Sequence, residues 1–138
     1  DCRCSDAHRT RYARRLSAPL LDRFDLRLRI ESPGTEPGPS SAEVRATIEA
    51  ARARQRSRFA NTRWQRNAHI PAGALAATIP LLGDAHEAWV DACRMRRLTG
   101  RGAARVRRVA RTLADLDGRE PVSADDIVRA SWLREDVW

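Results

Sequence analysis

The fold is decided by residues 101–116, which read RGAARVRRVARTLADL. Their apolar side chains recur at the spacing of one face of an α-helix: Val106, Val109, Ala110, Leu113 and Leu116. Arg101, Arg105 and Arg108 form a separate stripe, because about 100° per residue places them within roughly 60° of one another. Such a stripe can point at an anion held between domains, or it can face solvent. The pattern predicts an amphipathic helix over 100–116 that buries one side in a helical core.

Helical patterns also fill the rest of the chain from residue 41 onward. Ser40 with Glu43, and Ser123 with Asp126, have the spacing of capping boxes at helix starts. Asp84 is expected to cap a further helix. The expected helices cover residues 41–59, 71–78, 84–97 and 100–116, with a last helix after residue 123. The expected core consists of Val44, Ile48, Trp89, Val109, Leu113, Ile127 and Leu133, and the expected packing anchors are Trp64, Trp89 and Trp132.

A linker separates these helices from the first residues of the chain. Residues 32–40 hold three prolines and two glycines, which exclude a helix or a central strand. Before the linker, helical patterns cover about 8–16 and 20–23, and polar and apolar residues alternate over 25–30 as in a strand. A lone strand needs a sheet that this chain does not supply. We therefore expect a mainly α protein: residues 41–138 form a helical domain, 32–40 a linker, and 1–31 one helix and one strand left from an α/β domain.

The charge of the chain is strongly positive and comes from arginine. The formal net charge is +8, the sequence pI is near 11.1, and all 26 Lys-or-Arg positions are Arg. Because a guanidinium makes planar, bidentate contacts with phosphate, the expected partners are nucleotide, DNA or RNA. A GC-rich genome, whose codons favour Arg over Lys, would give the same bias without a function.

The three cysteines are an odd number, which does not suggest a disulfide framework, so a reducing, cytoplasmic location is expected. Cys2 and Cys4, with His8 nearby, could be part of a zinc site, but a structural zinc site needs four ligands. The alternative is two exposed thiols on a loop. No apolar run approaches the roughly 20 residues that span a membrane, and no membrane partner is expected.

Four segments of the sequence together resemble one family. They are residues 2–4 (CRC) with 11–16 (RYARRL), residues 16–26 (LSAPLLDRFDL), residues 40–45 (SSAEVR) with 51–55 (ARARQ), and residues 106–116 (VRRVARTLADL). In this order they resemble the ComM/YifB family of magnesium-chelatase-like AAA+ ATPases. The segment around Arg23 is similar to the family's arginine-finger segment, and residues 106–116 are similar to its sensor-2 helix. The chain therefore resembles the end of the α/β core and the helical lid of such an ATPase.

The resemblance implies a role for each of these segments. Arg23 would reach the γ-phosphate of ATP on a neighbouring subunit of a homohexamer, and Arg101 would contact ATP with Mg²⁺ in its own subunit. Arg105 and Arg108 are the alternative sensor residues. The resemblance also implies work on DNA, as a helicase or in branch migration during natural transformation, which makes DNA an expected partner. Because residues 2–4 resemble the family's cysteine-bearing loop, zinc binding by Cys2 and Cys4 stays an open alternative.

Other interpretations of the same residues stay open. The sequence has no Gly-rich loop followed by Lys, so the chain alone is not expected to hydrolyse ATP, and we expect it to be part of a longer protein. Arg23 could instead form a salt bridge with Asp22 or Asp25. The whole chain could be a stand-alone basic helical module that binds nucleic acid, or the lid of a metal-chelatase-type remodelling ATPase.

Overall fold

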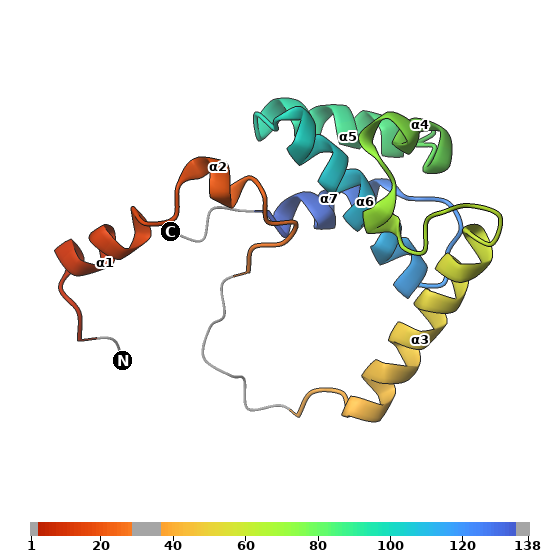
Figure 1. The fold of residues 1–138 in the computed structure, drawn as a ribbon, viewed down its shortest axis with the longest axis horizontal. Coiled ribbons are helices and arrows are strands. Elements are labelled where there is room, and N and C mark those ends of the chain that lie inside the picture. The colour runs from red at the N-terminus through yellow and green to blue at the C-terminus, as the bar shows by residue number, and fades with distance from the viewer. Residues whose placement is uncertain (1–2, 29–36, 135–138) are drawn as a thin grey trace.

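The computed structural model describes residues 3–28 and 37–134, which form a short N-terminal arm and a cluster of helices (Figure 1). The arm carries α1 (Asp6–Ala13) and α2 (Ala18–Leu21). The cluster carries α3 (Ser41–Arg58), α4 (Leu75–Thr78), α5 (Asp84–Met95), α6 (Gly100–Leu116) and α7 (Ala124–Trp132). Two short 3-10 helices, Asn67–His69 and Ala72–Ala74, lie between α3 and α4. The expected mainly α fold is confirmed.

The long helices begin where side chains satisfy free backbone N–H groups. Both expected capping boxes form, at Ser40 before α3 and at Ser123 before α7. The Thr99 hydroxyl oxygen accepts a hydrogen bond from the backbone N–H of Gly102 at 3.0 Å and caps α6. Asp84 is not the cap of α5 but its first residue. The preceding Gly83 occupies the cap position with φ of 52°, a conformation that glycine adopts without strain.

The first helix of the arm begins earlier than the sequence pattern predicts. Ser5 caps α1, accepting from the backbone N–H of His8 at 3.4 Å, so the helix starts at Asp6. The expected turn at residues 17–19 is the start of α2, where Ser17 is the cap and proline occupies the first turn. The arm therefore holds two short helices: α1 replaces the helix expected over about 8–16, and α2 replaces the helical turn expected over 20–23.

The expected strand over residues 25–30 is wrong for its described part. Residues 25–28 have no strand structure, and Arg29 and Ile30 lie outside the described residues. A strand needs a partner ladder, and none of the residues 3–28 and 37–134 forms one. The backbone N–H of Arg27 instead donates to the carbonyl oxygen of Leu133 at 2.7 Å, so this stretch lies against the end of the last helix.

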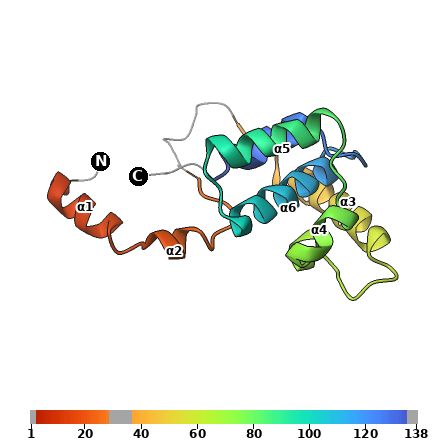
Figure 2. The same cartoon turned by 90° about the horizontal axis from the view of Figure 1, so that it is seen from above.

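α6 is the central helix of the core and contacts α3, α4, α5 and α7 (Figure 2). Val106, Ala110 and Ala114 of α6 are completely buried. Ile127 of α7 is also completely buried, as expected, and Trp89, Val109 and Leu113 pack against this core as partly buried side chains. The small alanines let the neighbouring helices approach α6 closely. The helical spacing of the apolar residues in 101–116 therefore identifies the buried face of α6 correctly.

Val44 and Ile48 do not belong to this core. Their side chains are 41% and 39% exposed, because the first half of α3 extends away from the other helices (Figure 1). Ala51 is the first residue of α3 that is buried. Leu133 is half-buried after the end of α7. The expected core is wrong at the start of α3 and right in α5, α6 and α7.

Two of the three expected tryptophan anchors pack against the core. Trp64 meets the ring of buried Phe59 edge-on, with centroids 6.2 Å apart, and Trp89 packs beside α6. Trp132 is different, because it lies at the last residue of α7 and is 57% exposed. The Arg96 guanidinium lies 5.1 Å from the centroid of its ring, within cation–π range.

A fully buried carboxylate joins α3 to α6. Asp115 accepts hydrogen bonds from Arg58 at 2.6 and 3.0 Å, from Arg111 at 2.9 Å, and from the Asn67 side chain at 2.8 Å. Burial acts to raise the pKa of Asp115, but the hydrogen bonds from Arg58 and Asn67 and the charge of Arg111 outweigh it and lower this pKa. Arg111 also donates to the backbone carbonyls of Arg119 and Glu120. The network holds the α6–α7 connection against α3.

Candidate functional site

Arg23 lies just after α2, and its side chain is exposed. Its backbone N–H donates to the carbonyl of Leu20 at 2.9 Å, which completes the last turn of the short helix. The guanidinium makes no hydrogen bond or ion pair within residues 3–28 and 37–134. A cation that is always charged is thus presented to solvent from a defined backbone position.

The acids beside Arg23 are bound by the helical cluster. The Asp22 carboxylate accepts from the Thr99 hydroxyl at 3.1 and 3.2 Å, and it lies 3.5 Å from Nη2 of Arg134. The Asp25 carboxylate pairs with Nε of Arg105 at 2.5 Å, and Arg105 also donates to the backbone carbonyl of Asp22. The salt bridge of Arg23 with Asp22 or Asp25, the alternative interpretation, does not form in this structure.

Arg134 completes this set of contacts from the far end of the chain. It is 5% exposed, and its Nη1 donates to the carbonyls of Phe24 at 2.5 Å and of Asp25 at 3.5 Å. Burial and then the nearby charge of Arg27 lower the pKa of Arg134. We call the grip of Thr99, Arg105 and Arg134 on residues 22–25 the clasp. Sequence analysis missed Thr99 and Arg134 as parts of a site, since neither stands in a pattern that points to residues 22–25.

The three candidate sensor arginines have different surroundings. Arg108 donates to the carbonyl of Ile70 at 3.0 and 2.6 Å, and burial lowers its pKa. Arg105 belongs to the clasp. Arg101 is exposed in the first turn of α6, and its guanidinium has no partner in the described part of the chain. Of the three, only Arg101 presents a guanidinium that is not already bound within the described residues.

The structure does not bring together the ligands of a complete metal site. Cys2 lies outside the described residues, and Cys4 is exposed. Among residues 3–28 and 37–134, no group of three or more His, Cys, Asp or Glu side chains could hold a metal ion. The zinc site stays a prediction that needs ligands from beyond this part of the chain. No helix in the described ranges combines the length and apolar character required to cross a bilayer.

A family model for the C-terminal part of magnesium chelatase subunit ChlI matches residues 38–134, and a second model for subunit ChlI matches residues 1–37. The first match alone covers well over half of the chain. The chain therefore belongs to the magnesium-chelatase-like family, and its helical cluster corresponds to the C-terminal domain of that family.

Individual relatives agree with this assignment. The chain is 34% identical to the uncharacterized protein YifB of Escherichia coli, over 98% of this chain and 26% of the relative. It is 33% identical to an uncharacterized protein of Mycobacterium bovis, over 98% of this chain and 28% of the relative. The chain thus spans about a quarter of the length of these curated relatives.

Proposed function

We propose that this chain supplies two arginines to ATP hydrolysis in a ring of AAA+ subunits. Arg23 serves the nucleotide of the neighbouring subunit as an arginine finger, and Arg101 serves the nucleotide of its own subunit as the sensor-2 residue. The observation that carries the proposal is the exposed Arg23 guanidinium, which has no partner among residues 3–28 and 37–134 although an acid lies one residue before it and another two residues after it. The clasp holds both acids, so the cation is available to an external anion.

This arrangement suits phosphoryl transfer. Negative charge on the γ-phosphate oxygens must be met by cations held in position, and a guanidinium offers a rigid fork of donors that is always ionised. ATP with Mg²⁺ is the ligand that we propose for each of the two guanidinium groups, neither of which has a partner within the described residues. The phosphate-binding loop and the Mg²⁺ ligands would come from the upstream part of the longer protein, as the resemblance implies.

The clasp also supports a link between the two arginines. Thr99 and Arg105 lie on either side of Arg101 at the start of α6, and both bind the segment that carries Arg23. A movement of α6 is therefore transmitted directly to residues 22–25. In the proposed ring, the nucleotide sensed by Arg101 in one subunit would set the position of Arg23 in the pocket of the next.

The test joins this chain to its native upstream sequence and measures ATP turnover of Arg23→Ala. We expect a loss on the order of 10³–10⁵, the range known for arginine fingers in related chemistry. The thermal unfolding midpoint should stay unchanged, because the Arg23 side chain has no described partner to lose. The matched control is Arg63→Ala, an exposed arginine without an assigned role, which should hydrolyse ATP normally.

Action in trans has its own measurement. Subunits with Arg23→Ala, mixed with subunits unable to bind ATP, should recover part of the turnover, since one of the two orientations of a mixed interface pairs an intact finger with an intact nucleotide pocket. Turnover of Arg23→Ala at the level of the unchanged protein would refute the finger role. A loss that mixing never restores would refute action across the interface.

We further propose nucleic acid as the substrate of the longer protein, in work such as DNA branch migration. The excess of arginine supports this choice over metal-chelatase-type remodelling, because a polyanionic strand is attracted to a surface of net charge +8. DNA-stimulated ATP turnover in the joined protein is the expected result. Turnover that DNA leaves unchanged would favour the chelatase-type alternative.

A further inference from the structure

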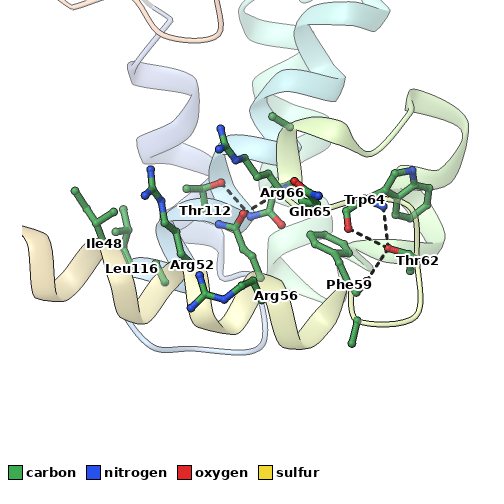
Figure 3. Close-up of a pocket in the computed structure, with 15 residues that line it drawn as sticks. Ile48, Arg52, Arg56, Phe59, Thr62, Trp64, Gln65, Arg66, Thr112 and Leu116 are labelled. Atoms are coloured by element: carbon green, nitrogen blue, oxygen red, sulfur yellow. Dashed lines mark hydrogen bonds between the residues drawn. The ribbon is translucent and has the colours of Figure 1, made fainter.

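An open groove lies between α3 and the loop that follows it (Figure 3). Its volume is about 880 Å³, and it is lined by residues of α3, by most residues of the stretch 59–68 and by two residues of α6. The inner wall includes buried apolar residues, Ala51 and Phe59, next to buried polar ones, Gln55 and Asn67. Ile48 and Leu116 lie at one end of the groove and Trp64 at the other. The groove is therefore a concave surface with a partly apolar floor that the fold itself leaves open.

The charged residues of the groove are all positive. Arg52 and Arg56 extend from α3, and Arg66 comes from the loop across the groove (Figure 3). All three are exposed, and none of their guanidinium groups has a hydrogen bond or ion pair with another described residue. No Asp or Glu is among the fifteen lining residues. Three guanidinium groups without a described partner, around a partly apolar floor, predict an anionic ligand that also carries apolar surface.

The groove continues along α3 toward the start of that helix. A second hollow of about 560 Å³ shares Ile48 and Arg52 with it and adds Arg45, together with one carboxylate, Glu49. Positions 45, 52 and 56 lie within about 40° of one another around the helix and span roughly 16 Å along it. The arginines thus form a row along one face of α3, which suits a ligand with repeated negative charges better than a single small anion.

We propose that this groove, defined by Arg45, Arg52, Arg56 and Arg66, binds single-stranded nucleic acid. The phosphates of a strand repeat along its length, and guanidinium groups recognise them directly. The unpaired bases of a strand offer apolar faces to the groove floor, whereas a duplex keeps its bases stacked inside. The inference rests on the proposal that nucleic acid is the substrate, and it adds the site and the form of that substrate.

The test measures binding of a fluorescently labelled oligothymidine to the 138-residue chain by anisotropy, without ATP, at several salt concentrations. The groove variant carries Arg52→Gln, Arg56→Gln and Arg66→Gln. The control variant carries Arg11→Gln, Arg15→Gln and Arg94→Gln, which remove the same charge from exposed positions outside the groove. Circular dichroism of both variants confirms that they are folded before binding is compared.

The groove variant is expected to bind at least about 10-fold more weakly, and its slope of log K against log salt should fall by about 2, since each lost phosphate contact removes about 0.7 for a single strand. The control variant should lose less than about 3-fold. Equal losses in the two variants would overturn the proposal, because overall charge would then explain the binding. A duplex that binds as tightly as the single strand, or displacement of the strand by ATP at micromolar concentration, would also overturn it.

The measurement separates this inference from the proposed ATPase role. Strand binding in this test needs neither ATP nor Arg23. A groove variant that does not lose binding as expected therefore leaves the arginine-finger proposal standing. If the groove variant loses binding as expected while the Arg23→Ala protein keeps full ATP turnover, the arginine-finger proposal is refuted and the strand-binding proposal stands.

Discussion

Replacing Arg105 by Met should release the segment that carries Arg23 without unfolding the helices. Methionine keeps an apolar stem on α6 but removes the guanidinium that pairs with Asp25 and donates to the carbonyl of Asp22. The backbone N–H of Arg27 reports the docked state, because it donates to Leu133 at the far end of the chain. That amide can exchange with solvent only when the segment separates from the cluster.

The size of the effect follows from the burial of each contact. The hydrogen bond from the charged Arg105 to a backbone carbonyl is worth about 1.5–3 kcal/mol. The ion pair with Asp25 adds at most about 1 kcal/mol, since the Asp25 side chain is 57% exposed. The total of about 1.5–4 kcal/mol corresponds to roughly 10- to 10³-fold faster exchange of the Arg27 amide.

Amide hydrogen exchange followed by NMR provides the assay. Arg101→Met is the matched control, because it removes a guanidinium from the same helix that has no described partner, and it should leave the Arg27 amide unchanged. The buried amides of α6 should exchange at the same rate in all three proteins. Unchanged exchange in Arg105→Met, or equal acceleration in Arg101→Met, would refute the reasoning about the clasp.

Three further outcomes are expected. Asp115→Asn should lower the free energy of unfolding by about 3–5 kcal/mol, measured by urea unfolding, because two buried guanidinium groups lose their carboxylate. The pKa values of Asp115 and Asp126 lie below the ordinary value. Burial acts to raise both pKa values, but hydrogen bonds and nearby arginine charge outweigh it. The two ionised carboxylates should therefore contribute their full stabilisation above about pH 4. This contribution should be lost as the pH falls through their lowered pKa values in the folded protein. Thermal unfolding across that pH range measures the loss. Burial raises the pKa of the Cys93 thiol, so at neutral pH Cys93 should react more slowly with a disulfide reagent than exposed Cys4, a difference that mass spectrometry of the labelled peptides resolves.

Each of these outcomes has a clear contrary result. Asp91→Asn, at an exposed position, is the control for Asp115→Asn and should change stability by less than about 0.5 kcal/mol. A similar small change for Asp115→Asn would mean that its network contributes nothing. Stability that rises below about pH 4 would contradict the sign of the two carboxylate shifts. Equal labelling rates for Cys93 and Cys4 would contradict the burial of Cys93.

The helical part of the fold could be predicted because its signals are local. The period of residues 101–116 gives both ends of α6, and the capping boxes at Ser40 and Ser123 give the starts of α3 and α7. The burial of Val44 and Ile48 could not be judged in this way. An apolar position on a helix is buried only if another element lies opposite, and sequence period does not say where a helix leaves the cluster.

The candidate site was predictable only in part. The segment around Arg23 and the candidate Arg101 could be found from their resemblance to a known family. The clasp could not, because Asp22 meets Thr99 and Arg134 across 77 and 112 positions of the chain. No periodicity connects positions so far apart, and a buried arginine after the last helix looks like any other charged residue near a terminus.

These sequence separations have a consequence for how the protein is made. Residues 22–25 leave the ribosome well before Arg134, which holds them from 112 positions further along the chain than Asp22. Closing a loop of this length costs conformational entropy, and no favourable contact offsets that cost until the helices that hold the segment have formed. The stretch bearing Arg23 is thus translated before the residues that hold it, and it settles only onto helices that have already folded.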